Sequence, residues 1–468
     1  MNKFMVKTLG CKANFSDGQA IEADLLTRGF STARNPEDAD FIIVNSCTVT
    51  DEADVQSRKM VRDLKKKNPQ VKVIYTGCAA EVDPEASLKI PGVNAVLGNQ
   101  NKFEAGALIA SHLQKDSPDA VLLGEVSSYG ELKSRHPMDR EWPLPEEGAI
   151  GSPILPAGSS TFRTRSFLKI QEGCDSFCTY CIIPYGRGPA RSLGIEAVVA
   201  RIQELAASGI REVVLTGTNI GDYGMDWSGS FQLDPLIEAI LTRTNLDRLR
   251  IGSLDPTEIS HRMIELMERH ESFCPHFHVS LQHTESKILK LMKRKYSKET
   301  VLDLFDRISR MKRKPFIGMD VIVGFPGETD EDFESMRNTL LEQHWSRLHV
   351  FPYSEREGTP ATRLPGVVER SLRKDRARNL QELSLKRLTS LFSGMRGGHL
   401  KGVLLEGMVK GPDGKREWIS GYSRDYQRVL VPSREEWSLR NSIVEVHAEN
   451  WVVDRASGEV SWIGALHE

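Results

Sequence analysis

Three cysteines lie close together near the middle of the chain, at Cys174, Cys178 and Cys181. Their C-x3-C-x2-C spacing offers three thiolates on one short loop. Three thiolates can hold three irons of a [4Fe–4S] cluster and leave the fourth iron open, and an open iron can bind and cleave S-adenosylmethionine. Zinc is the alternative, but zinc is usually closed by four protein ligands, and no fourth ligand lies nearby in the sequence. The spacing therefore favours a reactive iron–sulfur cluster.

Three further cysteines share a different placement. Cys11, Cys47 and Cys78 each follow an apolar run that is typical of a short buried strand. Ligands of open α/β sheets bind outside the carboxyl ends of the strands, so these three thiols are expected to converge in one crevice. Simple burial is the alternative, because free cysteine is often buried. The repeated placement favours a second metal site, whereas Cys274 has no partner pattern and is expected to be a packing residue.

Length and composition narrow the class of protein. The chain has 468 residues, of which 39% are hydrophobic and 27% charged, which is typical of a soluble globular protein with several domains. Its apolar runs are only strand-length, and the N-terminus lacks the apolar core of a signal peptide, so no membrane segment is expected. The odd number of cysteines with metal-type spacing predicts a reducing cytoplasm. The net charge of −2 means that any nucleic acid would be bound by local patches.

The first third of the chain reads as an α/β domain followed by a linker. Residues 1–125 alternate apolar strands with polar helices, which predicts a mostly parallel sheet. Proline, glycine and serine then accumulate without periodicity over 126–162, which is typical of a linker. Strands are expected at 3–8, 41–45, 71–76 and 94–97, and a helix with a basic last turn at 51–67.

The remainder predicts two more domains. Residues 163–396 contain six strand–helix units, which favours a partial TIM-type (β/α)6 barrel with its site at the carboxyl ends of the strands. The basic helical stretch at 371–396 is interpreted as a solvated face, with an RNA-facing stripe as the alternative. Short strands and turns over 397–468 predict a small β-barrel. The six strands are expected at 167–170, 213–217, 249–252, 276–281, 318–323 and 348–352.

Motifs along the whole chain resemble those of radical S-adenosylmethionine methylthiotransferases. The closest resemblance is to the branch that modifies N6-threonylcarbamoyladenosine next to the anticodon of tRNA. It implies an N-terminal methylthiotransferase domain, a central radical S-adenosylmethionine domain and a C-terminal RNA-binding barrel of the type called TRAM. Two positions depart from the family pattern: Asp255 replaces a glutamate, and 283–286 replaces a Ser-Gly-Ser run. The matching motifs are KTLGCKAN at 7–14, NSCTVT at 45–50, TGC at 76–78, 171–192, LTGTN at 215–219, SLDP at 253–256, DVIVGFPGE at 320–328 and HVFPYS at 349–354.

The resemblance also implies cofactors and partners. The first cysteine triad would hold a [4Fe–4S] cluster that cleaves S-adenosylmethionine, and the second would hold a [4Fe–4S] cluster that delivers the methylthio group. The implied partners are tRNA, a sulfur donor and an electron donor such as a flavodoxin or ferredoxin, in the cytoplasm. The oligomeric state is left open. Two alternatives remain: an enzyme acting on isopentenyladenosine in tRNA or on a ribosomal protein, and a non-catalytic iron–sulfur RNA-binding protein.

Several other side chains are candidates for binding. Gly217, Thr218 and Asn219 follow the second barrel strand and are expected to let the backbone approach the methionine end of the cofactor. Asp320 is expected either to bind ribose hydroxyls or an amine, or to serve as a structural partner. Tyr180 is expected near the adenine or in ordinary loop packing. His276 and His278 are expected in the core. The candidates for RNA binding are Tyr422, Arg424, Tyr426 and Arg428.

Overall fold

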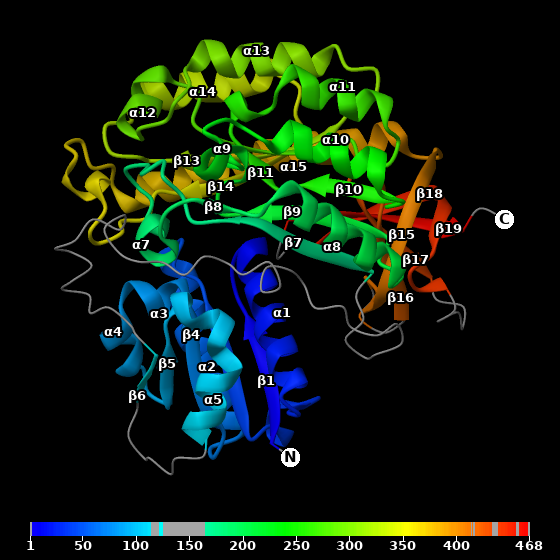
Figure 1. Ribbon diagram of the computed structural model, residues 1–468. Helices are drawn as coiled ribbons and strands as arrows, with labels where there is room; N and C mark the ends of the chain where they lie inside the picture. The colour runs from blue at the N-terminus through cyan, green and yellow to red at the C-terminus, as the bar shows by residue number, and fades with distance from the viewer. Residues whose placement is uncertain are drawn as a thin grey trace.

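The computed structural model describes residues 2–113, 121–124, 164–412, 414, 417–432, 439–454 and 458–466. The linker predicted at 126–162 lies outside these residues. Figure 1 shows an N-terminal α/β domain in blue and cyan against one side of a central half-barrel, and a small β-barrel in orange and red at its end. None of the helices within the described ranges is long and apolar enough to cross a membrane.

The N-terminal domain is built on a six-stranded parallel sheet in the order β2-β1-β3-β4-β5-β6. Every residue of the central strand β3 is buried, as expected for a parallel strand covered on both faces. Helix α2 packs on one face of the sheet, and α1 and α5 pack on the other. The bounds are β1 Lys3–Thr8, α1 Lys12–Thr27, β2 Ser31–Thr32, β3 Phe41–Ser46, α2 Asp51–Lys67, β4 Lys72–Gly77, α3 Cys78–Val82, α4 Pro84–Leu88, β5 Ala95–Leu97, α5 Ala105–Leu113 and β6 Val121–Leu123.

The bounds of helix α2 follow from the residues at its two ends. The Thr50 side chain caps its first turn by accepting from the amide of Ala53. Three acidic residues lie in the first turn and three lysines in the last, which complements the helix dipole at both ends. The predicted helix at 51–67 has the observed bounds.

The central domain is an open half-barrel of six long parallel strands, as predicted. Its two sheets have the orders β10-β9-β7-β8 and β11-β12-β13-β14, and a bridge between Leu249 and Phe273 joins them. The strands are β7 Arg165–Glu172, β8 Arg191–Ser192, β9 Glu212–Gly217, β10 Arg248–Ile251, β11 Ser253–Leu254, β12 His276–Gln282, β13 Phe316–Val323 and β14 Arg347–Pro352. The main helices are α7 Ile183–Arg187, α8 Ile195–Ala207, α10 Leu233–Arg243, α11 His261–Arg269, α12 Ser286–Leu291, α13 Lys298–Ser309 and α14 Asp330–Glu342.

Alternation along these strands makes the interior of the half-barrel polar. Phe277, Val279 and Leu281 of β12 pack in the core beneath the helices. Because neighbouring side chains point to opposite faces of a strand, His276 and His278 face the interior. The same argument places Asp320 of β13 and His349 of β14 inside, since Met319, Val321, Leu348 and Val350 belong to the helix-side core.

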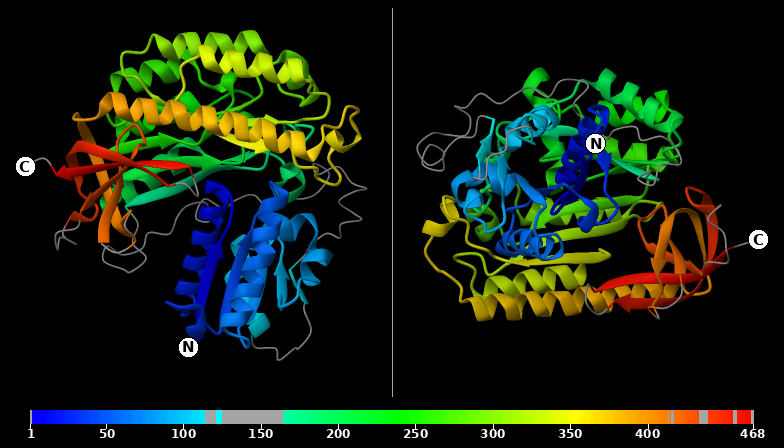
Figure 2. Two further views of the ribbon diagram at one scale, coloured as in Figure 1. Left: turned by 180° about the vertical axis from the view of Figure 1, so that it is seen from behind. Right: turned by 90° about the horizontal axis from the view of Figure 1, so that it is seen from below.

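The C-terminal domain is a closed five-stranded barrel, which confirms the predicted β-barrel. Helix α15 runs along the half-barrel and reaches the small barrel, as both views in Figure 2 show. Its Phe392 stacks on Trp462 inside the small barrel at 4.5 Å between ring centroids. The bounds are α15 Arg370–Met395, β15 His399–Lys410, β16 Glu417–Tyr422, β17 Arg428–Pro432, β18 Ile443–Asp454 and β19 Glu459–Leu466.

The basic stretch in α15 needs a correction. Arg373 and Arg376 are buried, so the interpretation as a solvated face is wrong for these two residues. Arg376 bonds Glu328 and Asp330 at 2.6 Å each, and Arg373 bonds Glu355 at 2.6 Å. The sequence pattern showed positive charge but not the carboxylates, which come from loops some 20–50 positions earlier in the chain. Both arginines therefore fasten the helix to the half-barrel.

Candidate metal centres

The first cysteine triad lies on the loop between β7 and α7, at the carboxyl end of the first barrel strand. The amide of Cys174 donates to the carbonyl of Gly188 at 3.0 Å, and the amide of Cys181 donates to the carbonyl of Cys178 at 3.0 Å. Gly173 has φ of 75°, and a methyl group there would lie 1.8 Å from the carbonyl oxygen of Pro189. Only glycine fits this turn, which folds the three thiols onto one side of the loop.

The second triad comes from three separate strand ends of the N-terminal domain. Cys11 precedes α1, Cys47 follows β3 and Cys78 begins α3. A methyl group on Gly10 would lie 2.6 Å from the sulfur of Cys47, so the first turn presses directly against the second. The side chain of Asn14 donates to the carbonyls of Leu9 at 2.7 Å and Ser46 at 2.9 Å, which ties these two turns together. The three strand-end cysteines are near enough for the charges of Cys47 and Cys11 to act on Cys78, and their joint role as ligands stays a prediction.

Burial makes most of these thiols poor acids on their own. It raises the pKa of Cys174 to about 11 and of Cys78 to about 12, and it also raises the pKa of Cys47 and Cys181. Thiolates at such positions need a cation to stabilise them, and iron bound to sulfur provides one. Within the described ranges no three cysteine, histidine or carboxylate groups could hold a single metal ion. The ligand role of both triads therefore stays a prediction.

The helices next to the two triads, α7 and α3, contact one another. Helix α7 begins two residues after Cys181, and α3 begins at Cys78. A methyl group on Gly186 of α7 would lie 3.6 Å from the β-carbon of Cys78. Figure 1 shows α7 of the half-barrel directly above α3 of the N-terminal domain. The loop that carries the first triad thus leads into a helix that touches the helix begun by Cys78, across the boundary between the two domains.

A buried network of charges joins the loops that carry the triads. Arg187 donates to Glu172 at 2.6 Å and to Asp17 of α1 at 3.0 Å. Lys102 bonds Glu172 at 2.8 Å, and Lys169 bonds both carboxylates. Burial alone would lower the pKa of Arg187, but Cys78, Glu172 and Asp17 hold it well above its usual range. With three cations against two anions, the network leaves positive charge facing the second triad, where it suits anionic cluster ligands.

Sequence reasoning missed Arg294, which reaches the first triad from the loop after α12. Its guanidinium donates to the sulfur of Cys178 at 3.1 Å and forms an ion pair with Asp255. Hydrogen bonds to cluster sulfurs tune the reduction potential of iron–sulfur sites. The signal that could have found it is Asp255, one of the two places where the chain departs from the family pattern, since a largely buried carboxylate needs a partner.

Four of the predicted cofactor residues surround the first triad. The Thr218 hydroxyl accepts from the amide of Gly173 at 3.1 Å, and the amides of Thr218 and Asn219 donate to the side chain of Gln171 at 3.0 and 2.9 Å. A methyl group on Gly217 would lie 2.7 Å from the carbonyl oxygen of Gln171. Tyr180 packs edge-on against Phe325 at 6.3 Å. Their contact with the cofactor remains a prediction.

Asp320 lies deeper in the half-barrel than the other candidates. Its carboxylate bonds the Nε2 atom of His278 at 2.8 Å, so it has the structural partner that the sequence left as one alternative. His278 in turn stacks on His349 at 5.3 Å. His276 is buried as expected, but its Nδ1 atom has no hydrogen-bond partner in the described part of the chain.

The four residues predicted to bind RNA face the half-barrel. Tyr422 stacks on Tyr426 at 4.8 Å, and Arg165 lies 4.5 Å above the Tyr422 ring. Arg424 donates to the carbonyl of Glu271 at 2.8 Å, and Arg428 pairs with Glu459. Tyr422, Arg424 and Tyr426 therefore contact the half-barrel, whereas the ion pair of Arg428 lies within the small barrel, and RNA binding by these residues stays a prediction.

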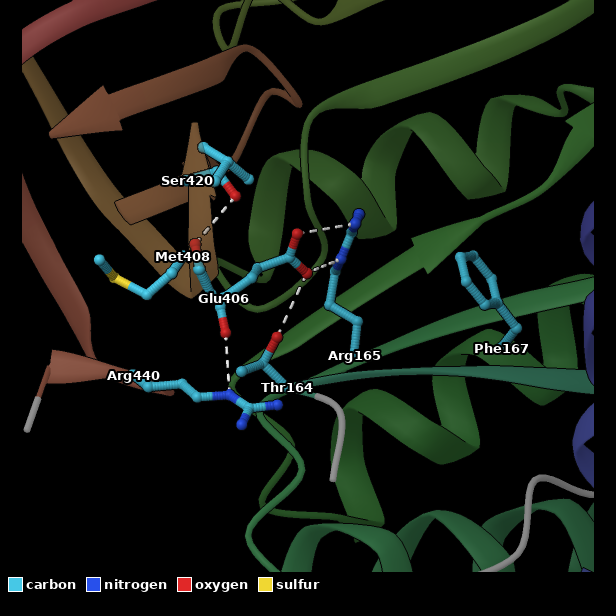
Figure 3. Close-up of a pocket in the computed structure, with 9 residues that line it drawn as sticks. Thr164, Arg165, Phe167, Glu406, Met408, Ser420 and Arg440 are labelled. Carbon is cyan, nitrogen blue, oxygen red and sulfur yellow. Dashed lines mark hydrogen bonds and ion pairs between the residues drawn. The ribbon is translucent and has the colours of Figure 1, made fainter. Parts of the chain in front are cut away.

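The same contact contains an ion pair at the start of β7. Figure 3 shows Glu406 of the small barrel between Arg165 and Thr164, with bonds of 3.0 Å and 3.2 Å. Arg440 donates to the carbonyl of Glu406 at 3.0 Å from the other side. The small barrel is thus fixed to the first barrel strand by charged groups.

Known protein families match two parts of the chain. Residues 3–98 match the uncharacterized protein family UPF0004, and residues 168–340 match the Radical SAM superfamily. The chain is 33% identical to the threonylcarbamoyladenosine tRNA methylthiotransferase MtaB of Aquifex aeolicus, over 86% of this chain and 93% of that protein. The chain belongs to the radical S-adenosylmethionine methylthiotransferase family. The resemblance seen in the sequence is confirmed.

Other relatives and solved structures agree with this membership. MtaB of Bacillus subtilis is 33% identical over 92% of this chain and 90% of its own length. A tRNA-2-methylthio-N(6)-dimethylallyladenosine synthase of Alkaliphilus oremlandii is 29% identical, over 98% and 92%. The radical S-adenosylmethionine methyltransferase TsrM of Kitasatospora setae, solved with cobalamin and a [4Fe–4S] cluster, has a TM-score of 0.56 and 14% identity over 77% and 74% of the chains. That last similarity concerns the fold alone.

Proposed function

We propose that the protein methylthiolates N6-threonylcarbamoyladenosine next to the anticodon of tRNA. The observation that carries this proposal is the pair of cysteine triads whose neighbouring helices, α7 and α3, are in contact across two domains. One triad alone would suit simple cleavage of S-adenosylmethionine, whereas two triads side by side suit transfer of sulfur to a substrate carbon. The choice of nucleoside follows the names of the MtaB relatives at 33% identity.

The residues divide the work between two clusters. Cys174, Cys178 and Cys181 would hold one [4Fe–4S] cluster, and Cys11, Cys47 and Cys78 the other. When bound, the first cluster supplies one-electron cleavage of S-adenosylmethionine, and the second supplies the sulfur that becomes the methylthio group.

The chain itself supplies binding, orientation and exclusion of water. Gln171 fixes the backbone of Thr218 and Asn219 beside the first triad, where it can position the cofactor. Arg294 stabilises negative charge on Cys178 through its 3.1 Å bond. Arg187 holds the segments that carry the two triads in place relative to one another, through its ion pairs with Glu172 and Asp17. The N-terminal domain covers the opening of the half-barrel and so keeps bulk water away from a reactive radical.

The proposed organisation assigns each domain a task. Residues 1–125 carry the sulfur-delivering cluster, 163–396 carry the radical chemistry, and 397–468 form a TRAM-like domain for RNA. The lysines at the end of α2, Lys66 and Lys67, and three residues of α15, Arg370, Lys374 and Arg378, are exposed and can contact phosphates. A cytoplasmic electron donor such as a flavodoxin or ferredoxin and a sulfur donor complete the reaction.

Nucleoside analysis tests the proposal directly. The purified protein is reconstituted with iron and sulfide without oxygen and incubated with S-adenosylmethionine, a reductant and tRNA that carries threonylcarbamoyladenosine. Mass spectrometry of the digested tRNA should show the 2-methylthio nucleoside. Product only from isopentenyladenosine tRNA or from a ribosomal protein would overturn the substrate, and absence of 5′-deoxyadenosine would favour a non-catalytic iron–sulfur RNA-binding protein.

A further inference from the structure

A cavity of about 170 Å³ lies inside the half-barrel, between strands β12–β14 and the small barrel. Its lining includes His276, His278, Arg347, His349 and Tyr426. Whole-ligand pockets usually measure roughly 300–1,000 Å³, so this cavity suits a substituent better than an entire nucleoside.

One cation lines this space and a second lies near residues that line it, and neither has a partner among the described residues. Arg347 lines the cavity, and Lys12 follows Cys11 at the start of α1, where its charge acts on His276, His349 and Tyr426. Neither side chain has a hydrogen bond or ion pair with any residue that the structure describes. Both are only partly exposed, and partly buried cations without a carboxylate are unusual. The charge of Asp320 acts on Lys12, but Asp320 forms no ion pair with either cation in the described part of the chain, and its Oδ1 atom is bonded to His278.

The arginines at the amino-terminal ends of the neighbouring strands provide the contrast. Arg248 and Arg250 share Glu212 at 2.7 and 3.2 Å, and Arg165 bonds Glu406 of the small barrel. These three arginines, whose role is structural, are therefore each paired with a carboxylate of the chain. Lys12 and Arg347 were left without them, which indicates that their negative partner comes from outside the chain.

Buried imidazoles add a second, independent observation. His276 is 4% exposed, and its Nδ1 atom lacks a hydrogen-bond partner within the described residues. Burial, followed by the charge of His278, lowers the pKa of His349 to about 4, so this ring is neutral near pH 7 and can donate or accept a hydrogen bond. Buried polar atoms are almost always paired in folded proteins, so unpaired ones in a cavity point to a polar ligand.

We infer that this cavity binds the threonylcarbamoyl group of the substrate adenosine, with Lys12 and Arg347 paired to its carboxylate. The inference rests on the proposed function and identifies the part of the enzyme that recognises the acidic substituent. Lys12 is the residue after Cys11, so its side chain connects the mouth of the second triad to the cavity. An adenine whose reacting carbon faces the triads can then extend its N6 substituent toward β12–β14.

The polar lining of the cavity also explains how the protein would distinguish a threonylcarbamoyl substituent from a dimethylallyl substituent. A dimethylallyl substituent has no polar atom, so it would leave Lys12, Arg347 and His276 desolvated and unpaired. Sites built to hydrogen-bond a substrate group reject analogues that lack the group far more strongly than apolar pockets reject extra atoms. The carboxylate could in principle be replaced by a backbone phosphate of the tRNA, which offers similar chemistry, so the test must separate these two sources.

Binding to two matched tRNAs makes that separation. The full-length reconstituted protein is titrated with tRNA carrying threonylcarbamoyladenosine and with the same tRNA carrying unmodified adenosine. Lys12→Met and Arg347→Met are compared with the wild type, and Lys312→Met, which removes an exposed charge from the turn before β13, serves as the matched control. Lys12→Arg tests rescue by a conserved charge. Iron content is measured for every variant, because Lys12 adjoins Cys11.

The wild type should bind the modified tRNA about tenfold more tightly or better, as expected for charge-assisted bonds to a desolvated carboxylate. Lys12→Met and Arg347→Met should lose most of this ratio at wild-type iron content, while Lys312→Met keeps it and Lys12→Arg recovers part of it. Unchanged ratios in both Met variants would overturn the inference. Equal weakening for both tRNAs would also overturn it, in favour of a phosphate. Failure of the proposed function would appear separately, as a wild type that forms no product from the modified tRNA.

Discussion

The two cysteine triads are built in opposite ways. The first is local: Cys174, Cys178 and Cys181 share one loop that is held by its own backbone bonds. The second is assembled from the ends of three strands, so it exists only when the parallel sheet of the N-terminal domain has formed. Local sites need little loop closure, whereas a distributed site depends on every contact that brings its parts together. Substitutions far from the first triad should therefore leave its iron binding unchanged, whereas substitutions that disturb the N-terminal sheet should lower iron binding at the second triad.

Removing the local triad should have the largest effect. Replacing Cys174, Cys178 and Cys181 by alanine should abolish formation of 5′-deoxyadenosine and lower bound iron by about four per chain, the content of one [4Fe–4S] cluster. The remaining iron should stay with the second triad. Iron and 5′-deoxyadenosine are measured after anaerobic reconstitution, with Cys274→Ala as the control because Cys274 is buried apart from both triads. Unchanged iron in the triple variant would refute the ligand assignment.

Breaking the assembled triad should separate the two chemistries. Cys47→Ala should stop methylthiolation while cleavage of S-adenosylmethionine continues, because the cleaving loop has its own backbone support. The ratio of methylthio nucleoside to 5′-deoxyadenosine is the measurement. A full yield of methylthio product from this variant would remove the role of the second triad.

The charge network offers a way to loosen the assembled triad without touching a thiol. Arg187→Met leaves Glu172 and Asp17 buried with one cation fewer, which should lower the free energy of unfolding by about 3–5 kcal/mol. Iron should be lost from the second triad before the first. Denaturant unfolding and iron release by a chelator measure the two effects, and Arg378→Met, at an exposed pair with Asp375, should change stability by less than about 0.5 kcal/mol. Equal iron loss from both triads would contradict the comparison.

The ion cluster around Glu212 belongs to the half-barrel and to its contact with the small barrel. It should make the stability of this part of the molecule depend on pH. Burial would raise the pKa of Glu212, but Arg250, Arg248 and Arg165 lower it to about 2. Because the folded pKa lies below the unfolded value near 4.5, the carboxylate adds roughly 3 kcal/mol of stability above pH 4.5, and this is lost as the pH falls toward 2. Urea unfolding between pH 6 and 3 should show the loss, and Glu212→Gln should flatten it. A parallel curve for the variant would contradict the assignment.

The comparison of the triads also shows how far sequence reasoning reaches. The strands of the half-barrel and α2 were predictable because their apolar periods and caps are local. The cysteines were predictable because thiol spacing is distinctive. Arg294 and Arg187 were not, since their partners lie 116 and 170 positions away along the chain. Tyr422 and Tyr426 were predicted to bind RNA, which stays a prediction; their contacts with the half-barrel were not predictable, because a strand sequence cannot tell an outer surface from a contact between two domains.

Helix α15 gives the molecule a fixed internal distance. Its 26 residues make a rod of about 39 Å. Ala377 and Leu380 belong to the core of the half-barrel, whereas Leu388 and Phe392 belong to the core of the small barrel. One continuous helix thus serves two cores, which leaves no hinge between them. A tRNA anticodon arm bound to the small barrel would therefore meet the half-barrel at one fixed distance and angle. A single residue inserted before Leu388 would rotate the small barrel relative to the half-barrel by about 100° about the helix axis.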